Sequence, residues 1–338
     1  MAYTSQFKIY SSSDVSHPVL NTASSGSLLA LMNACLITGY GSMPGAGWTK
    51  TGSLVALPDS QSCGIFVMPT GSRATLFVND AAPGVGGVRE ARLIGWDTVT
   101  TMSVAGLAGT NTTATGSNQF PTVAQLAIGQ GAVTARKSTD LSATERQWVL
   151  FADSSSVYAY ISTGDTAGMY YAFMFGDIYS AKSGSADTYK AILIGGIAEA
   201  AAGTVANQRL DGLSLVNAVT TGHFLQRSFS GFLTGVTAGK HGDGNKGSPT
   251  LLIGITQYPN AVDNGFYISP VWVHENTNST IRGKMRGFWH VLHALGSFSD
   301  GQPFTGTGDF AGRTFMVIKQ SANAGVYLME TSNTVETN

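Results

Sequence analysis

Three aspartates beside aromatic segments are the first residues of this chain that could do chemistry. Asp153, Asp165 and Asp177 stand next to runs rich in Tyr and Phe, and glycosidases use a pair of carboxylates to cleave a glycosidic bond. Asp165 lies in the Gly-rich turn of STGDTAGMYYAFMFGD (162–177). Because an aspartate in such a turn usually hydrogen-bonds its own backbone, we expect Asp165 to have a structural role.

Three further motifs are incomplete versions of reactive sites. GVTAGKH (235–241) has one residue too few between its glycines for a phosphate-binding loop, and a histidine where Ser or Thr would hold magnesium. HENTN (274–278) begins like a zinc-protease helix, but Asn278 replaces the second histidine. His290 and His293 lie in an expected strand, where residues three apart point to opposite faces. We therefore predict no catalytic residue, metal site or cofactor, and expect that the protein is not an enzyme.

Aromatic residues are the more suggestive group, because exposed rings on a sheet can stack on sugars. They gather in the middle of the chain and again after residue 270. We name four candidate contacts for a glycan or a protein partner: Tyr170, Tyr171, Trp272 and Trp289. The alternative is that they fill the core or a subunit interface, since aromatic side chains dominate both.

One short helix is expected near the start, at about residues 27–37. Apolar side chains recur there with helical spacing and form a single stripe, made of Leu28, Leu31, Met32 and Cys35. We expect Ser24, Ser25 or Ser27 to cap its first turn and Gly39 to end it. A helix of this length is not stable alone, so we expect the stripe to pack on the rest of the protein.

Elsewhere short apolar runs alternate with Gly-, Ser- and Asn-rich turns, which is typical of antiparallel β-structure. The sequence predicts a mostly β protein with one or two sandwich-like or barrel-like domains and the one N-terminal helix. An Ala-rich stretch near residue 200 suggests a boundary between an N-terminal β-domain that carries the helix (1–205) and a C-terminal β-domain (206–338).

Charge and composition exclude some classes of partner. Only 12% of the 338 residues are charged and the net charge is −1, without a basic stripe, so we expect no nucleic-acid binding. The first residues lack the pattern of a signal peptide, and the best apolar run, 191–203, is too short to span a membrane. Two cysteines do not make a disulfide framework, and Cys35 on the helix stripe is expected to be a buried free thiol.

The N-terminal block resembles a family of virion structural proteins of tailed bacteriophages. Its sequence is IYSSSDVSHPVLNTASSGSLLALMNACLITGYGSMPGAGWTK (9–50). Further similar stretches are REARLIGWDTVT (89–100), TGDTAGMYYAFMFGDIYS (163–180), GKHGDGNKGS (239–248), YISPVWVHE (267–275) and GRTFMVIK (312–319). The resemblance covers most of the chain and implies a component of the tail or baseplate, with no catalytic residue to carry over.

Residues and resemblance together predict a structural protein of a phage particle, in the tail, baseplate or fibre attachment. Its partners are then other virion proteins and further copies of itself, for example in a trimer, and it assembles into the virion in the host's cytoplasm. Three alternatives stay open: a receptor- or carbohydrate-binding protein of the tail tip, a capsid decoration or head fibre, and a glycan-cleaving tail enzyme.

Overall fold

The computed structural model describes most of the chain, and the account below concerns those residues. They are 3–4, 7–50, 62–81, 87–101, 115–122, 133–138, 140–162, 170–182, 187–197, 221–232, 238–241, 259–275, 280–293, 298–299, 301–319, 326–332 and 335–336. The protein is mostly β, with antiparallel sheets and one short helix near the N-terminus, which confirms the predicted fold class.

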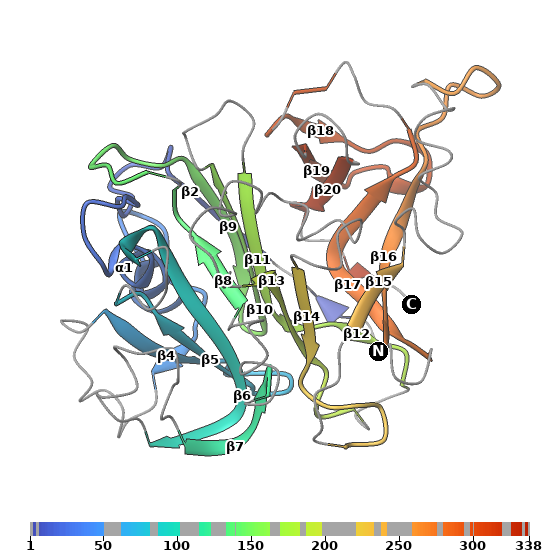
Figure 1. Cartoon of the computed structure of the whole chain (residues 1–338). Coiled ribbons are helices and arrows are strands. Elements are labelled where there is room, and N and C mark those ends of the chain that lie inside the picture. The colour runs from blue at the N-terminus through green and yellow to red at the C-terminus, as the bar shows by residue number, and fades with distance from the viewer. Residues whose placement is uncertain are drawn as a thin grey trace.

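The larger sheet contains twelve of the described strands. Ten follow one another along the sheet: β2 (Lys8–Ser11), β9 (Trp148–Asp153), β10 (Ser156–Ser162), β11 (Tyr170–Asp177), β13 (Ala191–Ile197), β8 (Val133–Arg136), β6 (Glu90–Thr101), β5 (Thr75–Asn79), β4 (Cys63–Val67) and β3 (Thr49–Lys50). Off this path, β14 (Thr221–Leu225) pairs with β13, and β7 (Thr115–Phe120) pairs with β6. Figure 1 shows this sheet at the left and centre of the molecule.

The second sheet lies beside the first and contains seven of the described strands (Figure 1). They are β15 (Ala238–His241), β16 (Ile268–Glu275), β17 (Thr280–Val291), β20 (Val326–Glu330), β19 (Thr314–Lys319) and β18 (Pro303–Thr305), with β12 (Tyr179–Ser180) paired to β17. Smaller elements are the pair β1 (Tyr3–Thr4) and β21 (Val335–Glu336), and 3₁₀ turns at Gly87–Arg89 and Gly308–Phe310.

The two sheets exchange strands across the predicted domain boundary at residue 205. β14 follows this point in the chain but belongs to the larger sheet, and β12 precedes it but belongs to the second. The division into 1–205 and 206–338 stays a prediction. Among the described helices, none is long and apolar enough to cross a membrane.

The central strands of the larger sheet are apolar on both faces, because both faces are covered. On β11, Phe173 and Phe175 point into a core shared with the helix, whereas Ala172 and Met174 point into a core shared with the second sheet. Side chains alternate between the faces of a strand, so a run such as AFMF has no polar face. This explains why these strands are almost continuously hydrophobic in sequence.

The larger sheet curls around the first of these cores. The turn between β4 and β5 reaches the turn between β9 and β10, where the hydroxyls of Thr70 and Ser154 lie 2.8 Å apart. Trp48 packs on Phe175, with ring centroids 6.0 Å apart. Among the described strands, β2 and β3 end the sheet without pairing with each other, so it is not a closed barrel.

Helix α1 (Ser27–Asn33), continued by a π-helical turn (Ala34–Thr38), fills the open side of this curl. The predicted stripe of Leu28, Leu31, Met32 and Cys35 is fully buried in the core, which confirms the docking prediction. The loop after the helix joins the two ends of the sheet: Lys8 and Tyr10 of β2 donate to the carbonyls of Gly45 and Pro44 at 2.7 and 2.8 Å, and the chain then enters β3.

The predicted caps of this helix need one correction. The residue before α1 is Gly26, and its first turn carries no side-chain cap from the three serines. Instead Asp80, which follows β5, accepts hydrogen bonds from the backbone N–H groups of Leu28 and Leu29 at 2.8 and 3.4 Å. Gly39 does end the helical segment with a positive φ of 78°, and a Cβ there would lie 2.4 Å from the Met43 carbonyl oxygen.

Candidate functional site

The four candidate aromatic residues do not share one surface. Tyr171 is 1% exposed and belongs to the core around the helix, and Trp289 is 8% exposed in the core of the second sheet. Neither side chain is available as an exposed contact, which corrects the proposal for these two residues. Trp272, at 37%, is exposed on β16. Tyr170 begins β11, but its side chain lies outside the described residues.

The aspartates first considered for catalysis are held in structural contacts. Asp153 receives hydrogen bonds from the guanidinium of Arg286 in the second sheet. Asp177 is buried, accepts from the backbone and hydroxyl of Ser72, and lies 3.7 Å from Lys190. Asp165 lies outside the described residues. Asp153 and Asp177 therefore join distant parts of the chain, and neither lines the two cavities described below.

Metal and thiol chemistry find no support in the described part of the chain. No three residues among its His, Cys, Asp and Glu side chains are grouped so that they could hold a metal ion. His293 is buried and accepts a hydrogen bond from the backbone N–H of Tyr267 at 2.7 Å, while the side chain of His290 is not described. Both cysteines are free and buried, and burial raises the pKa of the Cys63 thiol to about 12.

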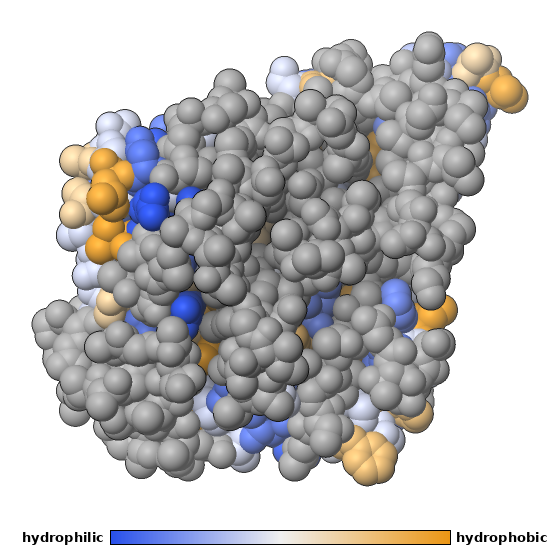
Figure 2. All heavy atoms as spheres, viewed as in Figure 1, coloured by the Kyte–Doolittle hydropathy of each residue, from blue (hydrophilic) through white to orange (hydrophobic). Residues whose placement is uncertain are grey.

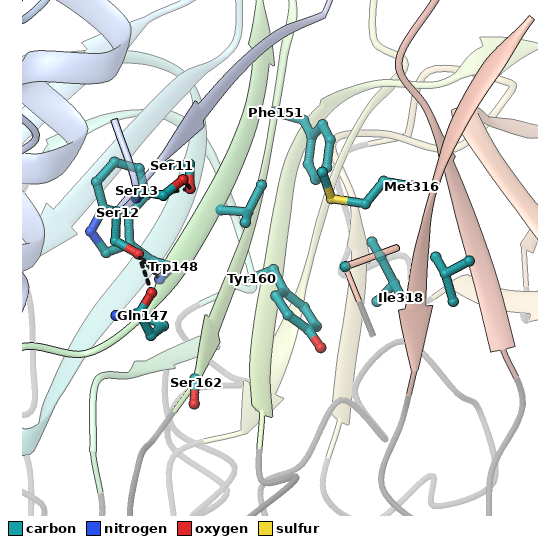
Figure 3. Close-up of a pocket in the computed structure, with 13 residues that line it drawn as sticks. Ser11, Ser12, Ser13, Gln147, Trp148, Phe151, Tyr160, Ser162, Met316 and Ile318 are labelled. Atoms are coloured by element: carbon teal, nitrogen blue, oxygen red, sulfur yellow. Dashed lines mark hydrogen bonds between the residues drawn. The ribbon is translucent and has the colours of Figure 1, made fainter. Parts of the chain in front are cut away.

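A groove of about 250 Å³ lies between the two sheets, at the end where β2, β9 and β10 face β19. Figure 3 shows Phe151 and Tyr160 pointing into it from the larger sheet, and Met316 pointing back from the second. Polar groups line its other side, where the Ser12 hydroxyl donates to Gln147 at 2.9 Å. The groove is thus an apolar slot with a polar edge of hydroxyl and amide groups.

The side chains that line this groove are suited to binding a ligand or a partner. Its described lining contains serine, glutamine, aromatic and aliphatic side chains, and no carboxylate, imidazole, thiol or amine. The hydroxyls of Ser11 and Ser13 hydrogen-bond each other at 2.8 Å. Such a surface can bury apolar atoms and exchange a few hydrogen bonds, as partner and ligand sites commonly do.

A larger pocket, of about 640 Å³, lies at the loop end of the second sheet. Its walls come from residues 263–268, from β18 and the turn that follows it, and from β19. Sequence reasoning missed it because its aromatic side chains are dispersed: Phe266, Tyr267, Phe298, Phe304, Phe310 and Phe315. The signal available was FSDGQPFTGTGDF (298–310), where three phenylalanines are spaced by Gly, Thr and Asp.

The structure thus contains two described cavities with binding character, one between the sheets and one at a loop end. No protein-family model matches the chain, and no curated protein matches it either.

Proposed function

We propose that the protein is a structural component of a tailed-bacteriophage particle, in the tail, the baseplate or fibre attachment, and that it acts through protein–protein contacts. The resemblance of residues 9–50 to virion proteins suggests the particle. The observation that supports action through protein–protein contacts is the distribution of apolar side chains on the surface of the protein. They occur at separate places, as a subunit with more than one neighbour requires (Figure 2).

The first of these places, named the N-terminal patch, consists of Val15, Val19 and Leu141. Their side chains are 86%, 51% and 70% exposed. The two segments that carry them are held together by a hydrogen bond from the Thr22 N–H to the Ser142 carbonyl at 3.0 Å. Because β-branched and leucine side chains gain free energy when they leave water, this patch is suited to an interface.

The second place, named the β16–β17 patch, consists of Trp272 and Ile281 with the nearby Phe229 and Phe232. All four side chains are exposed. Trp272 is paired with Lys284, and Ile281 with His274; the pair Val273–Gly283 and a register shift lie between them. The backbone N–H of Phe229 donates to Glu275 at the end of β16 at 2.6 Å, which places the phenylalanine turn beside these strands.

Charged side chains, by contrast, are largely used inside the molecule. Lys137, Arg282 and Arg286 are buried in ion pairs with Asp80, Asp187 and Asp153. Buried pairs of this kind fix the relative positions of distant segments when both partners are present. Distant segments joined by buried ion pairs, together with apolar contact surfaces, support the proposed role of a building block in an assembly.

The test of the proposed location is the particle itself. Phage particles made by a host that expresses the gene are purified by density gradient, and the protein is localised by mass spectrometry and by immunogold labelling. We expect the label at the tail or baseplate. A label on the head would overturn the tail assignment, and absence from purified particles would overturn the virion role.

Self-association through the N-terminal patch is the prediction that tests the mode of action. We expect Leu141→Asp to weaken self-association about tenfold or more, because burying a leucine contributes about 1.5–3 kcal/mol. The measurement is the concentration dependence of mass in sedimentation equilibrium. Val262→Asp, at another exposed valine, is the matched control and should leave association unchanged. Equal association of all three proteins would exclude this patch as a self-contact.

His17, between the two valines of this patch, is expected to titrate above its ordinary pKa of 6.5. The Asp14 carbonyl at 2.6 Å raises the pKa most, burial opposes it, and Glu145 at 2.5 Å raises it further. A raised histidine pKa adds stability below pH 6.5, which is lost as pH rises through the folded pKa. We predict that Glu145→Gln lowers this pKa in an NMR titration; an unchanged value would exclude the contact.

The alternative functions depend on other residues. Glycan cleavage would need Asp165, which lies outside the described residues, and Asp165→Asn with a glycan-release assay tests it. Receptor or carbohydrate binding is favoured by a specific observation, the aromatic pocket of the second sheet.

A further inference from the structure

The pocket at the loop end of the second sheet has an aromatic floor. Its rings are packed on neighbouring rings from behind: Phe304 stacks on the buried Phe315 at 5.1 Å, and Phe310 meets the edge of Trp289 at 5.3 Å. Phe304 and Phe310 are both only half-buried and line the cavity. The floor of the pocket is therefore a surface of ring faces and edges. Neighbouring rings hold it in position, and it remains accessible from the cavity.

The rim of this pocket is polar and is partly fixed in place. The Asp263 carboxylate accepts hydrogen bonds from the Tyr267 hydroxyl, from the Asn260 amide at 2.6 Å and from the Gly265 N–H at 2.8 Å. These bonds, led by that of Tyr267, hold the pKa of Asp263 below its usual range. Further polar groups of the pocket are Thr305, Thr307 and Asp309, which come from β18 and the following turn.

The charge and the size of this pocket narrow the class of ligand that it can bind. The described lining includes two carboxylates and no lysine, arginine or histidine. The nearby Arg313, 4.9 Å from the centre of the Phe310 ring, is paired with Glu330, so a phosphate or an acidic sugar would still meet repulsion. A small quaternary ammonium is bound by rings that close around it, whereas this cavity of about 640 Å³ is wide. The Asn264 amide and the hydroxyls of Thr305 and Thr307 would also find few hydrogen-bond partners on such a cation, because a quaternary ammonium has no N–H group.

We propose that this pocket binds an uncharged saccharide. Sugar rings present flat C–H faces, which pack on aromatic side chains, and a periphery of hydroxyl groups, which both donate and accept hydrogen bonds. Phe304 and Phe310 supply the apolar floor, Asp309 accepts from sugar hydroxyls, and the Thr307 hydroxyl does both. In the pocket, ring faces alternate with carboxylate, amide and hydroxyl groups. This arrangement matches the C–H faces and hydroxyl groups of a sugar better than it matches an apolar or an ionic ligand.

The experiment measures binding of the full chain to a panel of uncharged oligosaccharides of hexoses and N-acetylhexosamines, by saturation-transfer NMR and isothermal titration. An oligogalacturonate and choline are included as the anionic and cationic probes. We expect at least one uncharged oligosaccharide to bind, and neither charged probe. Absence of binding across the uncharged panel, or binding of choline or oligogalacturonate in its place, would overturn the proposal.

Two variants test whether the saccharide binds in this pocket. Phe310→Leu keeps apolar bulk but removes the ring, and Asp309→Asn removes a charge from an exposed side chain. Each should weaken binding about tenfold, the usual size of one good aromatic or charge-assisted contact. The matched control Phe232→Leu, at an exposed phenylalanine outside the pocket, should bind within about twofold of the unaltered protein, which is ordinary scatter among distant surface changes.

Thermal unfolding of each variant separates lost binding from lost folding, because Asp309→Asn should leave the midpoint unchanged even if Phe310→Leu lowers it. If Asp309→Asn and Phe310→Leu both bind like the unaltered protein, the saccharide is bound elsewhere and the assignment of this pocket is wrong. Saccharide binding is independent of the particle location, so its failure leaves the proposed virion role in place, and the reverse also holds.

Discussion

Replacing Arg286 by methionine should destabilise the protein by about 3–5 kcal/mol, the usual cost of leaving a buried ionic partner uncompensated. The guanidinium comes from β17 in the second sheet and donates to the Asp153 carboxylate at the end of β9 in the larger sheet. It also donates to the hydroxyls of Ser155 and Ser156. Both charged side chains are almost fully buried. Burial lowers the pKa of Arg286, but Asp153, together with Tyr158 and Tyr179, raises it above its ordinary value, so the guanidinium stays protonated.

Methionine fills much of the volume of arginine, so the loss in Arg286→Met comes mainly from the charge left on Asp153. The measurement is the free energy of unfolding in urea. Arg73→Met, at an exposed arginine on the turn between β4 and β5, is the matched control and should change stability by less than about 0.5 kcal/mol. A loss below about 1 kcal/mol in Arg286→Met would show that water or other groups satisfy Asp153, contrary to the buried geometry.

A double variant sharpens this test. Asp153→Asn removes the charge that Arg286→Met leaves unpaired, so the two changes together should cost less than the sum of their separate losses, by at least about 1 kcal/mol. Strict additivity would mean that the two side chains do not interact.

Local patterns in the sequence were enough to predict the helix and its contacts. The spacing of Leu28, Leu31, Met32 and Cys35 allows one buried face, and the structure buries that face. The cap could not be predicted in the same way. Asp80, which takes the place of a serine cap, lies 52 residues after Leu28 in the chain, and only the folding of β5 against the helix brings it there.

The candidate aromatic residues show a second limit. Alternation along β11 says that Tyr171 and Ala172 face opposite sides, but it does not say which sides are covered. Both are covered here, one by the helix and the curled sheet, the other by the second sheet. Burial of Tyr171 therefore follows from pairing between distant segments, such as β2 with β9 and β13 with β8, which no local pattern contains.

The aromatic pocket shows the same limit of sequence-based prediction, here for residues that were not predicted to form a site. Phe266, Phe304 and Phe310 come from three segments, and each alone is an ordinary apolar residue in a stretch that contains glycine. They become a surface because antiparallel pairing of β18 with β19 brings Phe304 opposite Phe315. In sheets of this kind, strand register decides which side chains lie next to one another. The amino-acid composition near a turn is therefore only a weak indication of a binding site.

Replacing Lys137 by methionine should be as damaging as the loss of Arg286, again by about 3–5 kcal/mol. Its ammonium lies 2.6 Å from the Asp80 carboxylate, and both side chains are fully buried. The same carboxylate accepts the N–H groups of Leu28 and Leu29 at the start of α1. Lys182→Met, at an exposed lysine, is the matched control and should change stability by less than about 0.5 kcal/mol.

The dependence of this loss on pH distinguishes an unpaired charge from a packing defect. Burial raises the pKa of Asp80, and in Lys137→Met the cation that opposes this rise is gone. A carboxyl whose pKa is higher in the folded state makes the protein more stable as pH falls, because the folded state binds the proton more readily. The stability difference between the unaltered protein and Lys137→Met should therefore shrink between pH 7.5 and about pH 5.

The helix start supplies an independent measurement of the same pair. Asp80→Ala removes the acceptor for two backbone N–H groups and leaves Lys137 buried without its partner, so it should be at least as damaging as Lys137→Met. Hydrogen exchange at Leu28 and Leu29 should accelerate in Asp80→Ala beyond the amides of β10, which lie away from the cap. Equal acceleration of both sets would mean that Asp80 stabilises the fold as a whole without a separate role in holding the helix that fills the curled sheet.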